Sequence, residues 1–146
     1  MIGCFFSIAE LADKGKSEPK NRYEEILDEN GEPLKAGDED RRYFEGPWLH
    51  KFNGKYYLSY STGTTHYLCY AEGDSPAGPF TYKGRIMEPV LGWTTHHSIV
   101  EIDGEWYLFY HDSSLSGGIN HQRCVMFREI KYNEDGTIQC MKPYED

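Results

Sequence analysis

The sequence predicts an all-β protein built from repeated hairpin units, and three observations support that class. Aromatic residues make up 15% of the 146 residues while the apolar share is only 38%, so the core must be built from Tyr, Phe and Trp. These residues favour pleated strands, and 15 Gly with 7 Pro disfavour long helices. The third observation is an internal repeat of two aromatic-rich hairpins.

A chain of 146 residues is expected to form one domain, and its charge and hydropathy disfavour two classes of partner. Fifteen Lys and Arg stand against 24 Asp and Glu, which gives a net charge of −9 and disfavours a broad basic face for nucleic acid. No run approaches the ~20 consecutive apolar residues of a membrane helix, and the mean hydropathy is −0.71. We therefore expect a soluble chain with neither nucleic-acid nor membrane partners.

In chain order, the first expected element is a strand over residues 1–12 that belongs to an incomplete unit. Residues 13–42 are rich in Lys, Glu, Asp, Gly and Pro, and they predict a long polar connection with one helical turn around residues 23–27. A structureless loop of this length is usually either functional or disordered, and the functional alternative places a site beside it. The four cysteines lack metal-binding spacing and are expected to be free thiols or small buried residues: Cys4, Cys69, Cys124 and Cys140.

The internal repeat places residues 47–60 over residues 97–110 without a gap. Each copy reads as a strand, a tight turn of Asn53-Gly54 or Asp103-Gly104, and a second strand rich in aromatic residues. Further strand-like segments follow the two hairpins at 67–71, 80–82, 124–132 and 137–140.

Four strands repeating at about 50 residues are typical of a β-propeller, with one blade over residues 43–90 and another over residues 91–142. The alternative is a β-sandwich with two hairpins that are alike by chance. Because a propeller closes with at least four blades, the chain is expected either to oligomerise or to be a fragment.

Each blade has one candidate site residue just before its innermost strand. Glu45 and His96 occupy neighbouring places in the aligned repeat, and innermost strands line the central channel of a propeller. The Gly-Pro-Trp that follows Glu45 gives a rigid turn and an apolar wall, which suits a carboxyl group to general-acid duty. Strand alternation turns His96 to the axis and His97 away from it. A surface acid and a structural histidine pair are the alternatives.

These motifs occur in an order that resembles the C-terminal half of glycoside hydrolase family 43. The resemblance runs from about residue 5 to residue 138 and rests on five segments: 44–48, 53–61, 74–80, 92–100 and 106–111. That family contains β-xylosidases and α-L-arabinofuranosidases on a five-bladed β-propeller. The resemblance therefore implies a partial five-bladed propeller of about two blades and part of a third.

The resemblance also implies the chemistry: an inverting hydrolase of xylose- or arabinose-containing plant saccharides with a Glu acid and two aspartates. The Glu-Gly-Pro motif of the family falls on Glu45, the acid. His96 resembles the residue that contacts a central calcium ion or its water shell, and Arg123 matches the sugar-binding arginine. Both family aspartates belong to earlier blades, so we expect the isolated chain to be inactive, with Asp40 and Asp112 the first two residues to test as a base.

Two other readings stay open at this point. One is a non-catalytic sugar-binding module in which Trp48, Trp93 and Trp106 hold a xylo- or arabino-oligosaccharide by stacking, and the other is an inactive truncated product. Trp48 and Trp93 are also substrate-binding candidates for the hydrolase. Self-association through open blade faces is expected in either case. The choice between xylose and arabinose, and the localisation, are not determined by these residues.

Overall fold

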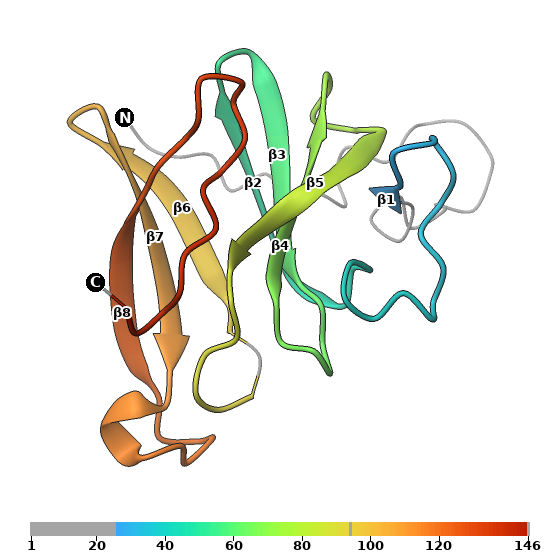
Figure 1. Ribbon diagram of the computed structural model, residues 1–146. Coiled ribbons are helices and arrows are strands. Elements are labelled where there is room, and N and C mark those ends of the chain that lie inside the picture. The colour runs from blue at the N-terminus through green and yellow to red at the C-terminus, as the bar shows by residue number, and fades with distance from the viewer. Residues whose placement is uncertain (1–25, 94, 146) are drawn as a thin grey trace, which may run out of the picture.

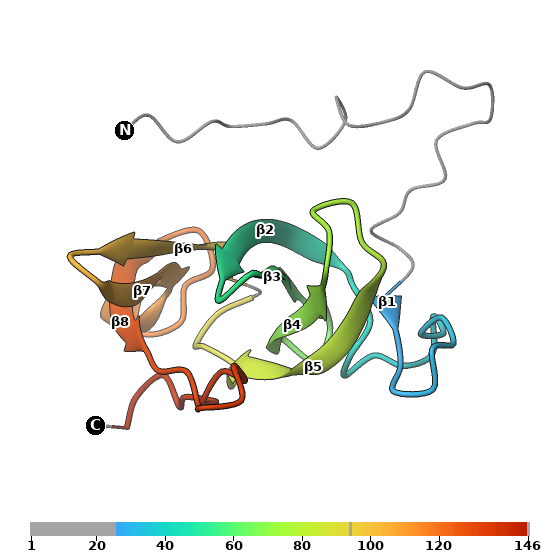
Figure 2. The same ribbon diagram turned by 90° about the horizontal axis from the view of Figure 1, so that it is seen from above.

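The computed structural model describes residues 26–93 and 95–145, which form two β-sheets that stand side by side (Figure 1). The first sheet has the order β1-β5-β4-β3-β2 and the second the order β6-β7-β8. The strands are β1 (Ile26–Leu27), β2 (Glu45–Phe52), β3 (Lys55–Ser61), β4 (Leu68–Gly73), β5 (Phe80–Met87), β6 (His97–Ile102), β7 (Glu105–Asp112) and β8 (Cys124–Ile130). The view from above shows the curl of the first sheet beside the second (Figure 2). The all-β class is thus confirmed.

The two hairpins of the repeat form as the turn residues predict. Asn53 and Gly54 have φ values of 45° and 82°, and Asp103 and Gly104 have values of 53° and 89°. Two successive residues with positive φ are the mark of the tight hairpin turn that continues the twist of its strands, and Asn, Asp and Gly tolerate that conformation best. Both hairpins consequently share one register, with Leu49 opposite Leu58 in the first and Ile99 opposite Leu108 in the second.

The first repeated unit is a four-stranded antiparallel meander, β2 to β5, to which β1 adds a fifth strand. β1 pairs in parallel with β5, with Ile26 opposite Phe80. The expected helical turn is therefore wrong at Ile26 and Leu27, because burial of Ile26 and pairing with β5 outweigh the local preference. Residues 23–25 and the strand expected over residues 1–12 lie outside the described residues.

The second unit departs from the expected four strands after β8. The turn at residues 133–137 forms, with the Asn133 N–H donating to the Thr137 carbonyl at 2.8 Å. Beyond it, only Ile138 bridges back to Tyr132, while Met141 pairs in parallel with Met87 of the first sheet. The fourth strand expected at residues 137–140 is therefore wrong: the pairing is limited to the Ile138 bridge and the Gln139 N–H that donates to the Lys131 carbonyl, and from Met141 the chain hydrogen-bonds with the first sheet instead.

Two apolar clusters cover the two faces of the first sheet. Alternation along β3 sends Tyr57 toward the second sheet and Leu58 and Tyr60 to the opposite face. The cluster between the sheets contains Tyr57, Leu68, Tyr70, Ile86, Met87, Val90, Ile99, Leu108, Tyr110, Ile130 and Ile138. The three described cysteines are free thiols. None of the helical turns in the described part of the chain has the length and apolar character needed to cross a membrane.

Polar side chains of β3 cross the gap between the sheets at every second residue. The Tyr57 hydroxyl donates to the Gly136 carbonyl at 2.8 Å, Ser59 Oγ lies 2.6 Å from His97 Nε2, and the Ser61 hydroxyl donates to the Thr95 carbonyl at 2.6 Å. We call these three contacts the inter-sheet seam. They fix the register of the first blade on the second.

A buried histidine beside the seam makes folding sensitive to pH. His50 stacks on Tyr57 with ring centroids 5.1 Å apart, and its Nε2 lies 2.7 Å from the Tyr132 hydroxyl. Burial lowers the pKa of His50 to about 4. The unfolded chain, with an imidazole pKa near ~6.5, therefore binds a proton more readily than the folded chain does.

We expect the free energy of unfolding to be constant above about pH 7 and to fall as the pH drops from ~6.5 to 4, by up to about 3 kcal/mol from His50 alone. Urea unfolding at a series of pH values measures this. His50→Gln should make the fall smaller without abolishing it, because burial also lowers the pKa of His97 to about 3, whereas His121→Gln, at an exposed histidine, should leave the profile unchanged. Identical profiles for His50→Gln and the parent would contradict the assignment.

Candidate active site

Glu45 and His96 come together at one end of the inter-sheet seam. Glu45 begins β2 opposite Ser61, and the Ser61 hydroxyl holds the Thr95 carbonyl just ahead of β6. His96 follows Thr95, so its ring is brought to the start of β2, where Nε2 lies 3.8 Å from Glu45 Oε2. The Glu45 side chain is 33% exposed and that of His96 58% exposed, so both are open to solvent at this end. His97, in contrast, turns into the seam toward Ser59.

A glycine makes the approach of His96 to β2 feasible. Gly46 has φ +65°, a left-handed conformation that costs little only for glycine. A Cβ atom at this position would lie 3.2 Å from Cδ2 of His96, closer than an ordinary contact. The Glu-Gly-Pro sequence therefore serves two purposes: it supplies the carboxyl group, and it leaves room for the imidazole beside it.

His111, at the end of β7, connects His96 to Arg123. Its Nε2 accepts the backbone N–H of His96 at 3.1 Å and lies 3.2 Å from Arg123 Nη1. The Arg123 Nε donates to the Asn120 carbonyl at 2.8 Å. Burial lowers the pKa of His111, and the positive charge of Arg123 lowers it further. Glu45, His96, His111 and Arg123 thus form one continuous cluster drawn from both sheets.

His111 is not among the candidate site residues that the sequence singled out. The repeat did contain a signal, because the 50-residue offset places His111 opposite Ser61, a residue at the end of the equivalent strand. Both residues reach Thr95: Ser61 through its hydroxyl, and His111 through its backbone, whose N–H donates to Thr95 Oγ1 at 3.1 Å.

The three tryptophans do not share a surface among the described residues. Trp48 donates its indole N–H to the Ile99 carbonyl at 2.9 Å, which ties it to the packing between the sheets. Trp106 packs edge-on against Phe52 in the same interior, at the opposite end of β7 from His111. Trp93 alone is well exposed, at 45%, with its ring 4.6 Å from that of His66. This arrangement favours Trp93 over Trp48 as an aromatic surface for a sugar.

Neither aspartate singled out in the sequence is placed as a free base. Asp112 is 2% exposed, and it accepts hydrogen bonds from Ser114, Cys124 and Tyr144. Burial works to raise its pKa, but these donors outweigh burial and hold the pKa below its usual value. Asp40 Oδ2 lies 3.7 Å from Arg85 of β5. Both carboxylates are engaged in contacts outside the Glu45 cluster.

The donor set around His96 is poor for a cation held by protein alone. Within residues 26–93 and 95–145, no group of three or more His, Cys, Asp or Glu side chains converges on one point. Calcium takes six to eight oxygen ligands, and the described neighbourhood of His96 offers the Glu45 carboxylate. The residues present therefore fit only an ion whose shell is mostly water.

The contact between Gly46 and His96 can be tested by substitution. Gly46→Ala should lower the free energy of unfolding by about 1–2 kcal/mol through backbone strain and should also displace the His96 ring. Gly54→Ala is the matched control, because Gly54 has φ +82° and open space around its Cβ position. Urea unfolding measures the first effect and the NMR shifts of the His96 ring measure the second. Equal shifts of those signals in both variants would rule out the contact.

The family model of glycosyl hydrolases family 43 matches residues 6–138. A xylosidase/arabinosidase 43A from Humicola insolens is 62% identical over 118 residues, and a xylosidase/arabinosidase from Bacteroides ovatus is 61% identical over 113 residues. The alignments cover 81% and 77% of this chain but only 36% and 35% of the two relatives. The chain thus spans about a third of the length of these relatives.

Solved structures give the same result. A β-xylosidase/α-arabinofuranosidase from a compost microbial metagenome, in complex with xylotriose and in a calcium-free form, superposes with a TM-score of 0.82 at 62% identity. The match covers 84% of this chain and 37% of that protein. A family 43 enzyme from Xanthomonas citri complexed with xylotriose gives 0.81 at 58% identity. The partial propeller is thereby confirmed, and this chain belongs to glycosyl hydrolases family 43.

Proposed function

We propose that this chain is the part of a glycoside hydrolase that supplies the general acid and a sugar-binding arginine for inverting cleavage of xylose- or arabinose-containing saccharides. The observation that carries the proposal is the Glu45, His96, His111 and Arg123 cluster, assembled across the seam from both blades. The similarity to xylosidase/arabinosidase relatives, and to structures with xylotriose bound, supports the substrate class.

In this proposal Glu45 protonates the glycosidic oxygen as the leaving group departs. Its carboxyl group is part exposed at the open end of the seam, where a saccharide could approach without displacing the core. Arg123 presents guanidinium donors to sugar hydroxyls from the side of β8, and Trp93 offers an aromatic face for stacking. The cluster therefore holds a proton donor on β2 of the first sheet and a sugar anchor in the loop that leads to β8 of the second.

An inverting hydrolase also needs a base across the sugar, with its carboxyl group ~6.5–9.5 Å from the acid. Asp112 is enclosed by its hydrogen-bond donors and Asp40 lies beside Arg85, so the described residues favour a base supplied by other parts of a complete propeller. This supports the expectation that residues 1–146 alone do not turn over substrate. It also weighs against a sugar-binding module built on the three tryptophans, which do not converge.

A calcium ion is proposed beside His96, held mainly by water. The donor set beside His96 fits only such an ion, and one similar structure is a calcium-free form of its enzyme, which supports calcium binding in that relative. Calcium there would supply a fixed positive charge near the sugar. His96 would orient its water shell, while Glu45 keeps the proton-donor role.

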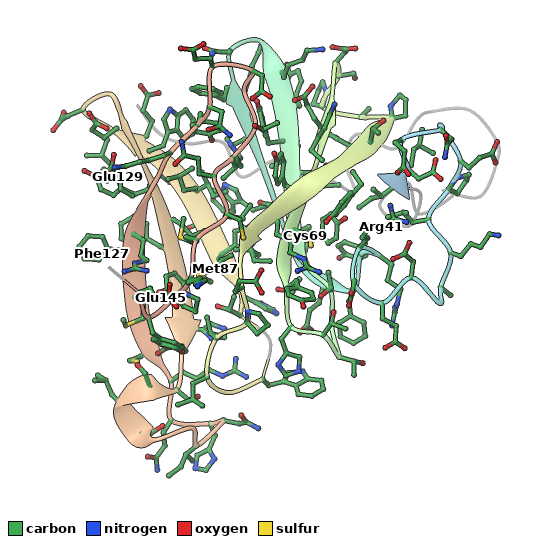
Figure 3. All side chains as sticks on the ribbon, in the orientation of Figure 1. Arg41, Cys69, Met87, Phe127, Glu129 and Glu145 are labelled. Carbon is green, nitrogen blue, oxygen red and sulfur yellow. The ribbon has the colours of Figure 1, made fainter. Side chains whose placement is uncertain are left out.

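Self-association is proposed through the outer face of the second sheet. Val125 and Phe127 of β8 are 79% and 64% exposed, and the Phe127 ring stacks on that of Phe109 with centroids 5.8 Å apart. Figure 3 shows Phe127 directed away from the rest of the molecule. A contiguous apolar face of this kind is an association surface in a folded chain.

The acid role of Glu45 can be tested in a hybrid in which this chain replaces the aligned third of the Humicola insolens relative. Glu45→Gln should lower hydrolysis of xylobiose at least ~100-fold and that of an activated dinitrophenyl xyloside by less than about tenfold, because only the poor leaving group needs protonation. Glu101→Gln, at an exposed glutamate of β6, is the control. Equal losses on both substrates would contradict the assignment of Glu45 as the acid. Turnover by residues 1–146 alone would contradict the need for a base from another part of a complete propeller.

The association surface predicts a concentration-dependent mass for the isolated chain. Val125→Thr combined with Phe127→Thr keeps strand-forming residues and removes most of the exposed apolar area, so the mass should shift toward that of a monomer. Sedimentation equilibrium measures it. Ile119→Thr, on an exposed loop, should leave the mass unchanged. A double variant that associates as strongly as the parent would show that another face is responsible.

A further inference from the structure

We propose that His111 is a positioning residue that fixes the sugar-binding guanidinium of Arg123 to the edge of β6. The inference rests on the proposed function of Arg123, and it assigns to His111 a role that the motif carrying Glu45 does not contain. Its basis is a single nitrogen, His111 Nε2, that contacts both the His96 backbone N–H and Arg123 Nη1.

The chemistry of the two partners determines the state of the ring. A backbone N–H and a guanidinium N–H can only donate, so Nε2 must be the nitrogen without a proton, and the neutral ring carries its proton on Nδ1. In this tautomer His111 Nε2 is the one acceptor that connects Arg123, in the loop before β8, with His96, the residue before β6. The imidazole is thus a bridge between two elements rather than a ligand of the substrate.

Arg123 depends on this bridge because its other contact is local. The Asn120 carbonyl that accepts from Arg123 Nε lies only three residues away, so that bond moves together with the loop. His111 belongs to β7, in the middle of the second sheet, and its contact ties the exposed guanidinium to a rigid strand. A long flexible side chain held at two points loses less entropy when it binds a sugar hydroxyl.

The His111 side chain is not what holds its own strand in place. Its backbone is fixed separately, since the N–H donates to Thr95 Oγ1 at 3.1 Å and the carbonyl accepts from Thr95 Oγ1 at 2.6 Å. β7 also pairs along its length with β6 and β8. Replacing the imidazole should therefore leave the sheet intact and alter only the bridge.

Two substitutions of His111 distinguish a positioning role of its side chain from a purely structural one. Gln places an amide oxygen near the position of Nε2 and can accept both donors, whereas Phe keeps the planar ring but has no acceptor. On residues 1–146, His111→Phe should speed hydrogen exchange of the His96 amide, which donates to His111 Nε2, at least ~10-fold, and His111→Gln should stay within about threefold of the parent. Both variants should unfold at similar urea concentrations.

In the hybrid hydrolase, His111→Phe should raise KM for xylobiose roughly tenfold and change kcat by less than about threefold, because Arg123 holds the sugar equally in the ground and transition states. His111→Gln should restore KM, and His121→Phe should leave it unchanged. An unchanged KM in His111→Phe, or no rescue by Gln, would overturn the inference while leaving the acid role of Glu45 intact. An indifferent Glu45→Gln variant would instead overturn the proposed function.

Discussion

Three buried hydroxyl groups of β3 make the inter-sheet seam, which holds the two sheets in one relative position. Tyr57, Ser59 and Ser61 are almost fully buried, and each meets a partner on the second unit. A buried hydroxyl that loses its partner costs ~1–3 kcal/mol, so only one register of one sheet on the other satisfies all three. A slip of one residue in β3 would turn these groups into the apolar cluster around Leu58 and Tyr60.

The active-site cluster inherits its geometry from this seam. On the first sheet, Glu45 is paired with Ser61. The Ser61 hydroxyl donates to the Thr95 carbonyl, and His96 is the next residue after Thr95. The distance between the carboxyl group and the imidazole is therefore set by one short hydrogen bond and by the glycine that admits the ring. A site that straddles two sheets is positioned as accurately as their packing allows, and here that packing is directional as well as apolar.

The C-terminal segment, residues 141–144, packs against the end of the seam that carries the cluster. Met141 pairs with the end of β5, and the Tyr144 hydroxyl both donates to Asp112 and accepts the Leu91 N–H at 2.6 Å. Asp112 follows His111 directly, and Leu91 lies in the loop that leads to His96. The buried Asp112 carboxylate is thus a structural anchor beneath the cluster, which explains why its hydrogen-bonding capacity is already occupied.

The features that depend on neighbours along the chain could be predicted from the sequence. Asn-Gly and Asp-Gly turns and period-two alternation specified both hairpins, and the repeat placed Glu45 and His96 at neighbouring positions just before equivalent strands, because turn chemistry and strand pleating act within a few residues. Tertiary contacts set the parallel pairing of β1, the pairing of Met141 with the first sheet, the packing of the partly buried Trp48 against the core between the sheets and the bridge made by His111. Each of these depends on a partner dozens of residues away, and burial and hydrogen bonding with such partners outweigh the local preference of the segment.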